Sequence, residues 1–250
     1  MKQLKDFNST LLKSFWFKLI KFIVFLYQKL ALKADLNFKT SLPNEPKIFV
    51  VNHPSSLDPI YMMSLFPQQL AIMVHETLFK VPVLGFLLKK SGHIKVIEGK
   101  GSEVLAHAQN IIENGKSVMA FLEGNTSFAI TKLRKAKTGA VRLALMTGAP
   151  IVPVGIYLDF KKIKVIEAEL HGRYERGQFY LSGPYKVTVG KPIYLKGDIE
   201  DRSYVRKISK KLIELVIDLI KQSEKRTKMT KGVGKLLKFL TTSLRRSNNI

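Results

Sequence analysis

Short apolar runs alternate with helical segments from residue 47 onward, and this alternation constrains the fold more than any other feature of the chain. Runs of strand length, apolar almost throughout, occupy residues 47–51, 70–74, 94–97, 117–122 and 151–158. Strands of this kind are buried on both faces, and a helical connection returns the chain so that successive strands lie parallel. The pattern predicts an α/β fold, with a single domain in which helices flank a mostly parallel central sheet.

The N-terminal segment has a pattern of its own. Residues 15–32 are almost continuously apolar, and on a helix Lys18, Lys21 and Lys29 fall on one narrow stripe. A lysine near the centre of a bilayer costs about 2.5–3.5 kcal/mol, so we expect a helix that lies in the membrane interface without spanning the membrane. The alternatives are a helix of the protein core and a cleaved signal peptide. No small-residue cleavage site supports the signal peptide.

The C-terminal part is predicted to complete the domain and to end in a basic tail. Strands are expected at 178–181 and 185–189, followed by an amphipathic helix over 202–221. Beyond Glu224 no acidic residue occurs, and basic residues mix with leucines, as in helices that bind membrane surfaces. A disordered polycationic tail is the alternative. The chain is thus divided into an N-terminal amphipathic membrane-associated helical segment (1–43), an α/β domain (44–223) and a basic amphipathic tail (224–250).

The charge of the chain calls for an anionic partner. The formal net charge is +23, which suits nucleic acid, an anionic membrane leaflet or an acidic carrier protein. No helix-turn-helix, zinc-finger or aromatic–basic stacking motif is present, and aromatic residues gather in the apolar segment 15–32, which favours lipid over nucleic acid. The chain has no cysteine, which excludes disulfides, thiolate zinc sites and a cysteine nucleophile.

A histidine and an aspartate follow the first predicted strand, in the sequence Asn52-His53-Pro54-Ser55-Ser56-Leu57-Asp58. This position, just past the carboxyl end of a strand, is where α/β sheets place their sites. Asp58 can accept a hydrogen bond from one ring nitrogen of His53, which leaves the other nitrogen to take a proton from a hydroxyl. For the pair considered alone, a capping role at a turn is the alternative.

A second group of polar residues follows the strand at 117–122, in the sequence Glu123-Gly124-Asn125-Thr126-Ser127. Glu123 can hydrogen-bond substrate hydroxyls, and Gly124 permits close approach of the backbone to a ligand. Considered alone, the group is equally an ordinary turn in which Thr126 or Ser127 caps a helix. A third block, residues 149–156, is by itself a buried strand with prolines at its edge.

In their order and spacing these blocks resemble the glycerolipid acyltransferase family typified by 1-acyl-glycerol-3-phosphate acyltransferase. That family shows N-H-x-x-x-x-D, a strand ending near I-D-R, then F-P-E-G-T-R-S, then V-P-V. The first block is intact here as Asn52, His53 and Asp58. Residues 79–85 resemble the usual linking helix of the family, and residues 137–154 also match well. The resemblance covers roughly residues 46–156.

The resemblance implies a lipid O-acyltransferase of phospholipid biosynthesis. His53 would be the general base and Asp58 would hold it, while a lysolipid hydroxyl attacks a thioester of coenzyme A or acyl carrier protein. The family's default acceptor is 1-acylglycerol-3-phosphate, and neither a metal nor another cofactor is expected. The enzyme would work on membrane lipids at the cytoplasmic face of a membrane. The residues expected to bind substrate are Asn52, Glu123, Gly124, Asn125, Thr126 and His75.

Three basic residues of the family pattern are replaced here: Thr126 and Glu98 stand in place of arginine, and His75 in place of a lysine. Because arginine forks fit phosphate oxygens, their loss suggests an acceptor without a phosphate monoester, such as a larger lysophospholipid or a glycolipid. Alternatively, other basic residues supply the charge, namely Lys100, Lys132 or Arg134. A catalytically silent scaffold and a thioesterase, in which water replaces the lipid alcohol, are further interpretations.

Overall fold

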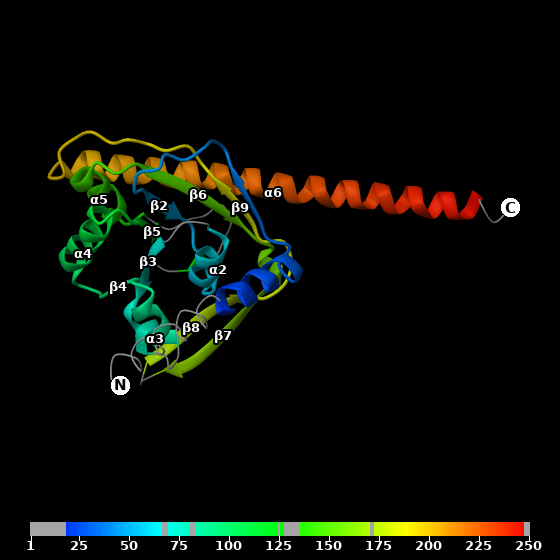
Figure 1. Cartoon of the computed structure of the whole chain (residues 1–250), viewed down its shortest axis with the longest axis horizontal. Helices are drawn as coiled ribbons and strands as arrows, with labels where there is room; N and C mark the ends of the chain where they lie inside the picture. The colour runs from blue at the N-terminus through cyan, green and yellow to red at the C-terminus, as the bar shows by residue number, and fades with distance from the viewer. Residues whose placement is uncertain are drawn as a thin grey trace, which may run out of the picture.

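A seven-stranded sheet forms the centre of the protein (Figure 1). The structure is a computed structural model that describes residues 19–66, 70–80, 84–124, 126–127, 136–170 and 173–247. In spatial order the strands are β1 (Asp35–Phe38), β9 (Lys186–Val189), β6 (Ile151–Tyr157), β2 (Ile48–Val51), β5 (Ser117–Phe121), β3 (Leu70–His75) and β4 (Ile94–Val96). Strand β9 runs antiparallel to β6, and the other neighbouring pairs are parallel. The predicted α/β fold is confirmed.

Helices cover both faces of the sheet, which explains why its central strands are apolar throughout. One face carries α4 (Gly101–Glu113), α5 (Gly139–Thr147) and the first part of α6 (Arg202–Ser247), and the other carries the N-terminal helix (residues 19–30), α2 (Asp58–Leu65) and α3 (Leu84–Lys90) (Figure 1). Along β2, Phe49 and Val51 join the core on the α2 side, whereas Ile48 and Val50 join the core on the α4 side. This alternation is the two-residue period of a strand.

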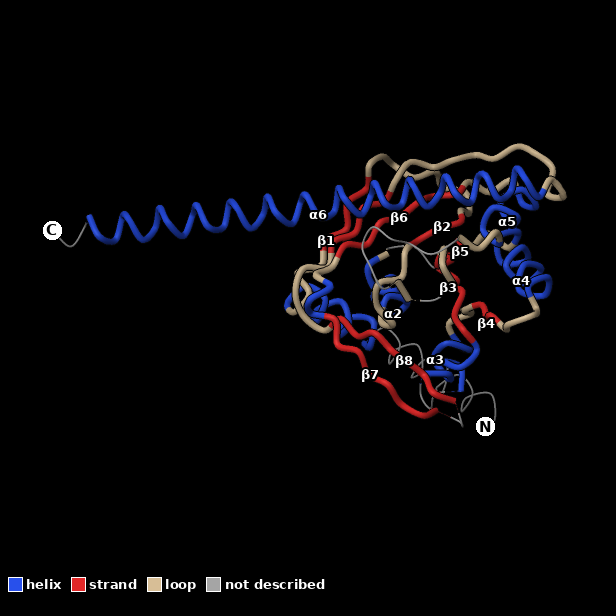
Figure 2. The backbone as a smooth tube through the Cα atoms, turned by 180° about the vertical axis from the view of Figure 1, so that it is seen from behind, coloured by secondary structure: helices blue, strands red, loops and turns tan. Residues whose placement is uncertain are grey.

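Two strands lie outside the runs that the sequence identified. Strand β1 adds residues 35–38 to the sheet edge, although these residues were grouped with the N-terminal helical segment. Strand β7 (Ile163–Leu170) pairs antiparallel with β8 (Arg173–Tyr180) in a separate hairpin (Figure 2). Strands β1 and β7 are partly open to solvent. Their sequences therefore mix polar and apolar residues and lack the apolar run of a buried strand. Short 3-10 helices occupy Glu76–Lys80 and Phe160–Lys162.

Helix α6 is longer than the sequence indicated. It continues to Ser247, past the expected end near residue 221, and its later part extends away from the body of the protein (Figure 1). A glycine inside a helix costs about 1 kcal/mol, and the many lysine, leucine and arginine residues around Gly232 and Gly234 offset this cost. The predicted membrane-binding face of 224–250 depends mainly on side chains beyond residue 229. In this part of the helix the structure describes the backbone only.

The first part of α6 is held tightly against β6 and β9. A Cβ atom on Gly155 of β6 would lie 2.5 Å from the backbone nitrogen of Ile220, so only glycine lets the helix approach this closely. Further along, Arg226 donates to the carboxylate of Asp35 in β1 (2.9 Å) and to the backbone carbonyl of Val187 in β9 (2.8 Å). The helix thus ties one edge of the sheet to its centre.

His93 is a buried core histidine beside β4, with 6% of its surface exposed. Its Nδ1 atom accepts a hydrogen bond from the backbone N–H of Ile72 (3.1 Å), and its Nε2 atom lies 3.3 Å from the sulfur of Met63. An Nδ1 atom that accepts carries no proton, so the geometry selects the neutral ring. Burial favours the same form and lowers the pKa of His93 to about 4.

The stability of the folded protein should therefore decrease as the pH falls from about 6.5 toward 4. In this interval the unfolded chain binds a proton at His93 that the folded chain excludes, and the free energy of unfolding should drop by about 3 kcal/mol in total. Above pH 6.5 this contribution is fully present. His93→Asn keeps an acceptor for the Ile72 N–H but does not titrate. Urea unfolding at several pH values should show a shallower pH dependence for the variant, and identical slopes would contradict the prediction.

Candidate active site

His53 and Asp58 meet at the carboxyl end of β2. His53 lies in the loop after β2 and Asp58 is the first residue of α2, and the His53 Nδ1 atom is 2.9 Å from the Asp58 Oδ2 atom. An ionised carboxylate only accepts hydrogen bonds, so Nδ1–H donates and Nε2 is left with a free lone pair. The histidine side chain is 14% exposed and the aspartate side chain is fully buried. With Nδ1 bonded to the carboxylate, Nε2 is the ring nitrogen suited to take a proton.

The imidazole is also fixed from the side by an aromatic ring. Phe121, the last residue of β5, stacks on His53 with ring centroids 4.0 Å apart and an angle of 19° between the planes. Because the ring is held between this stack and the carboxylate, it presents one defined edge to a substrate.

The Asp58 carboxylate is satisfied on both of its oxygens. The Oδ2 atom accepts from His53 and from the backbone N–H of Ser55 (2.8 Å), and the Oδ1 atom accepts from the hydroxyl of Tyr185 (2.8 Å). Burial, and then the charge of Asp58, raise the pKa of Tyr185 well above its ordinary value, so its hydroxyl stays protonated and donates. No sequence motif pointed to Tyr185, which is 127 residues away from Asp58 in the chain.

Strand β8 holds the loop that carries the pair. The backbone N–H of Ser56 donates to the carbonyl of Gln178 (2.7 Å), and the N–H of Gln178 donates to the Ser56 hydroxyl (3.0 Å). The buried Ser55 hydroxyl donates to the same carbonyl (3.2 Å) and accepts from the N–H of Tyr180 (3.2 Å). The two serines of the motif therefore serve to anchor the loop, and their roles could be assigned only after β8 was placed.

The second predicted block lies directly against the first. The backbone N–H of Ser127 donates to the carbonyl of His53 (2.7 Å), and the Ser127 hydroxyl donates to the carboxylate of Glu123. Glu123 is 3% exposed, and Gly124 has a φ of 72°, a left-handed conformation that favours glycine. The structure thus brings Glu123 and Gly124 into the neighbourhood of the histidine, and their substrate-binding role stays a prediction.

The expectation for Asn52 requires a correction. Its side chain is 2% exposed, and both ends of the amide are bonded to the backbone of Ile156 in β6, Nδ2 to the carbonyl (2.9 Å) and Oδ1 to the N–H (2.8 Å). A side chain that is buried and bonded to the backbone at both ends of its amide is not offered to a substrate. Asn52 instead ties the end of β2 to β6 and so fixes the point from which His53 projects.

The remaining residues predicted to bind substrate are Asn125, Thr126 and His75. Thr126 is half-buried next to Ser127 and Asn125 lies outside the described residues. His75 is exposed at the end of β3, where its Nδ1 atom lies 3.0 Å from the hydroxyl of Thr77. Their substrate-binding roles stay predictions. Of the basic residues considered as replacements, Lys100 pairs with Glu103 (3.0 Å), and Lys132 and Arg134 fall outside the described residues.

A lysine that the sequence did not single out lies over the Glu123–Gly124 turn. A Cβ atom on Gly124 would be 3.3 Å from Cε and 3.5 Å from Cγ of Lys137, so the lysine stem crosses the glycine. The backbone N–H of Lys137 donates to the carbonyl of Leu122 (2.8 Å), which fixes this crossing. Since Nζ is bonded to Cε, a positive charge lies beside the turn that lacks the family's arginine.

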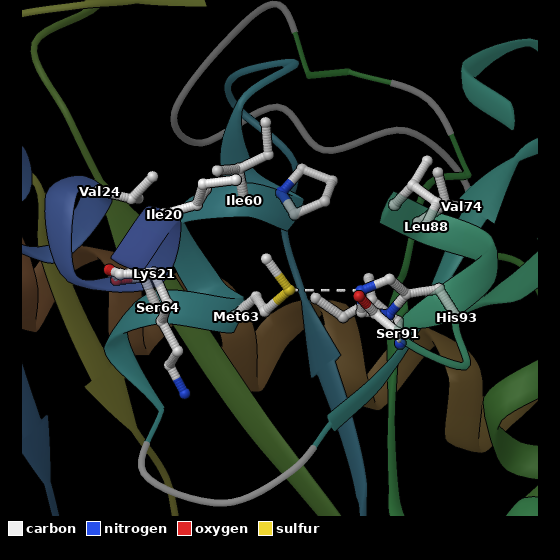
Figure 3. Close-up of a pocket in the computed structure, with 12 residues that line it drawn as sticks. Ile20, Lys21, Val24, Ile60, Met63, Ser64, Val74, Leu88, Ser91 and His93 are labelled. Atoms are coloured by element: carbon white, nitrogen blue, oxygen red, sulfur yellow. Dashed lines mark hydrogen bonds between the residues drawn. The ribbon is translucent and has the colours of Figure 1, made fainter. Parts of the chain in front are cut away.

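An apolar cavity of about 190 Å³ opens beside α2, the helix that begins at Asp58 (Figure 3). The N-terminal helix contributes Ile20 and Val24 to its wall, and the Met63 sulfur meets the His93 ring at another side. The other lining residues are Lys21, Pro59, Ile60, Ser64, Ile72, Val74, Leu88 and Ser91. A cavity of this composition suits an aliphatic chain.

The sequence is similar to that of known proteins. The sequence is 26% identical over 202 residues to a 1-acyl-sn-glycerol-3-phosphate acyltransferase of Saccharomyces cerevisiae, covering 78% of this chain and 62% of that protein. It is 28% identical over 167 residues to a chloroplastic 1-acyl-sn-glycerol-3-phosphate acyltransferase of Brassica napus, covering 65% of this chain and 45% of that protein. The chain thus spans about half to three fifths of the length of these relatives.

The protein is also similar to a solved structure, and its sequence matches the model of a protein family. The crystal structure of the 1-acyl-sn-glycerophosphate (LPA) acyltransferase PlsC from Thermotoga maritima superposes with a TM-score of 0.59 at 22% identity, covering 86% of this chain and 88% of that one, which shows a shared fold. The profile of the family described as Acyltransferase matches residues 33–157, half of the chain, and this stretch includes His53, Asp58 and Glu123. The chain therefore belongs to the acyltransferase family.

Proposed function

We propose that this protein moves a fatty acyl group from a thioester of coenzyme A or acyl carrier protein to the hydroxyl of a lysolipid at a membrane surface. The observation that carries the proposal is the His53–Asp58 pair, in which a buried carboxylate orients an imidazole whose second nitrogen remains available. A pair of this kind is suited to activating a hydroxyl as a nucleophile.

In the proposed reaction the substrate itself provides the nucleophile. The lysolipid hydroxyl oxygen attacks the thioester carbonyl carbon while its proton passes to Nε2 of His53, and Asp58 stabilises the imidazolium that forms. The tetrahedral intermediate then collapses, the carbon–sulfur bond breaks, and the imidazolium returns the proton to the leaving thiolate. The products are a new ester and a free thiol, and the proposed reaction uses no metal or redox cofactor.

The proposed acceptor is 1-acyl-sn-glycerol-3-phosphate. The names of the relatives support this choice, and Lys137 supplies a cation beside the Glu123–Gly124 turn where Thr126 replaces the family's arginine. Glu123 lies near the histidine through Ser127, and we propose that the turn it forms with Gly124 helps to orient the glycerol backbone. The apolar cavity beside α2 is proposed to receive part of an acyl chain.

The orientation of the N-terminal helix supports a membrane-surface location. Gln28 is fully buried against the protein and donates to the carbonyl of Tyr61 (2.9 Å), whereas Phe22, Ile23 and Leu30 are 60%, 56% and 71% exposed. No helix among the described residues is long and apolar enough to cross a bilayer. We propose that the exposed apolar face enters the acyl region of one leaflet, on the cytoplasmic side, with the body of the protein above it.

His53→Ala should lower kcat for transfer from acyl-coenzyme A or acyl carrier protein to 1-acyl-sn-glycerol-3-phosphate by roughly 10²–10⁴-fold, because the base that accepts the hydroxyl proton is lost. Asp58→Asn should lower it by a smaller factor. A matched control is His107→Ala, which removes an exposed histidine on α4 and should leave the rate unchanged. A wild-type protein that transfers no acyl group to any of a panel of lysolipids would support the silent scaffold, and release of free fatty acid instead of lipid product would indicate a thioesterase.

Lys137→Gln should reduce kcat/KM for 1-acyl-sn-glycerol-3-phosphate about tenfold, since a charge-assisted contact with the phosphate is removed. Transfer to an uncharged monoacylglycerol, however slow, should be unaffected. Lys100→Gln is the matched control because Lys100 is already paired with Glu103. A wild-type preference for neutral or zwitterionic acceptors would instead favour the alternative drawn from the three replaced basic residues.

Replacing Phe22, Ile23 and Leu30 together by asparagine should weaken binding to anionic liposomes, measured by sedimentation, by on the order of a thousandfold or more, because each buried large apolar side chain contributes about 1.5–3 kcal/mol. Activity on detergent-dispersed lysolipid should persist, since these side chains point away from the core. The same substitution at three polar positions of α4, exposed Glu103 and Glu113 and half-buried Gln109, provides the control. Undiminished liposome binding by the first variant would exclude this face as the membrane contact.

A further inference from the structure

We propose that Tyr185 is a positioning residue for the His53–Asp58 pair, and that its hydroxyl holds the carboxylate in the orientation that steers the imidazole. The inference rests on the proposed acyl transfer and adds a residue that lies outside the sequence blocks of the family and outside the matched residues 33–157. Its basis is the hydrogen bond of 2.8 Å from the Tyr185 hydroxyl to Oδ1 of Asp58.

The need for such a residue follows from the geometry of a carboxylate. The bond between Cβ and Cγ of aspartate permits broad rotation, so contacts to one oxygen alone leave the group free to swing. At Asp58 the His53 ring and the Ser55 N–H both bind Oδ2. The side chain is fully buried, so solvent does not supply a donor for the other oxygen. The Tyr185 hydroxyl fills that position and fixes the carboxylate plane.

Tyr185 is itself rigid enough to act as a reference point. Its backbone N–H donates to the carbonyl of Leu32 (2.9 Å), and its carbonyl accepts from the N–H of Asp35 (3.2 Å). Its fully buried ring packs edge-on against Tyr61, with centroids 5.3 Å apart at 81°. Residues 32–35 and the Tyr61 ring therefore fix the position of the hydroxyl, and both the tyrosine and the Asp58 side chain that it contacts are fully buried.

The test is Tyr185→Phe, which removes the hydroxyl and keeps the ring. Since the hydroxyl contacts Asp58, kcat should fall about tenfold, equivalent to about 1.4 kcal/mol. Because the hydroxyl is buried and does not contact substrate in the proposed reaction, KM for both substrates should change less than about twofold. The matched control is Tyr61→Phe, which removes a neighbouring buried hydroxyl that donates to the carbonyl of Tyr180 (2.9 Å). Tyr61→Phe should lower Tm comparably but leave kcat within about twofold of the wild type.

A second arm asks whether Tyr185 acts through Asp58. In an Asp58→Asn background, Tyr185→Phe should change kcat by less than about twofold, because the carboxylate that it positions is gone. A tenfold loss that persists undiminished in this background would overturn the proposal. So would a Tyr185→Phe variant with the kcat of the wild type, or a loss confined to KM.

A third arm needs no activity and separates this proposal from the proposed function. Proton NMR should show the Nδ1–H of His53 as a downfield signal, assigned by its absence in His53→Gln, and Tyr185→Phe should shift or broaden that signal. Absence of acyl transfer by the wild type together with this shift would defeat the proposed reaction and keep the positioning role. An unchanged His53 signal in Tyr185→Phe would defeat the positioning role whatever the activity.

Discussion

The rest of the site depends on the hydrogen bonds that the buried carboxylate of Asp58 accepts. An ionised group with no exposure to water is costly, by several kcal/mol, unless partners compensate for its lost hydration. Here three donors surround it, from His53, Ser55 and Tyr185, and its position at the start of α2 adds the favourable end of the helix dipole. Each donor comes from a segment that other contacts hold in place, so the pair exists only when these segments have assembled.

The framework that assembles them is the parallel sheet and the hairpin beside it. Strands β2 and β5 end next to each other, and this brings His53 into contact with Phe121 and with the Glu123–Ser127 turn. Asn52 locks the same strand end to β6, and β8 binds the loop through Ser55 and Ser56. The loop of the motif is thus bonded on one side to the sheet and on the other to the hairpin, which limits the freedom of the imidazole.

Two structural features support the proposed lipid substrate. The N-terminal helix buries Gln28 against the core and leaves Phe22, Ile23 and Leu30 exposed to solvent, which is unusual for large apolar side chains. The same helix forms part of the wall of the apolar cavity beside α2, so the face proposed to meet the membrane and the space proposed for an acyl chain share one element. At the polar end of the site, Lys137 provides a charge that the replaced arginine no longer supplies.

The sequence by itself determined the α/β fold and the proximity of His53 and Asp58, because both are encoded locally: strand and helix periods differ, and only four loop residues separate the histidine from the aspartate. The orientation of the pair depends on the assembled segments. The sequence also indicated the Glu123–Gly124 turn through the order of its blocks. Only the tertiary structure decided the roles of Asn52, Lys137 and Tyr185, because each depends on a partner that a distant segment delivers. The edge strand β1 and the hairpin strand β7 likewise escaped the sequence pattern. Strands that are open to water need no continuous apolar run, so their pairing is decided by neighbours and leaves little trace in their own residues.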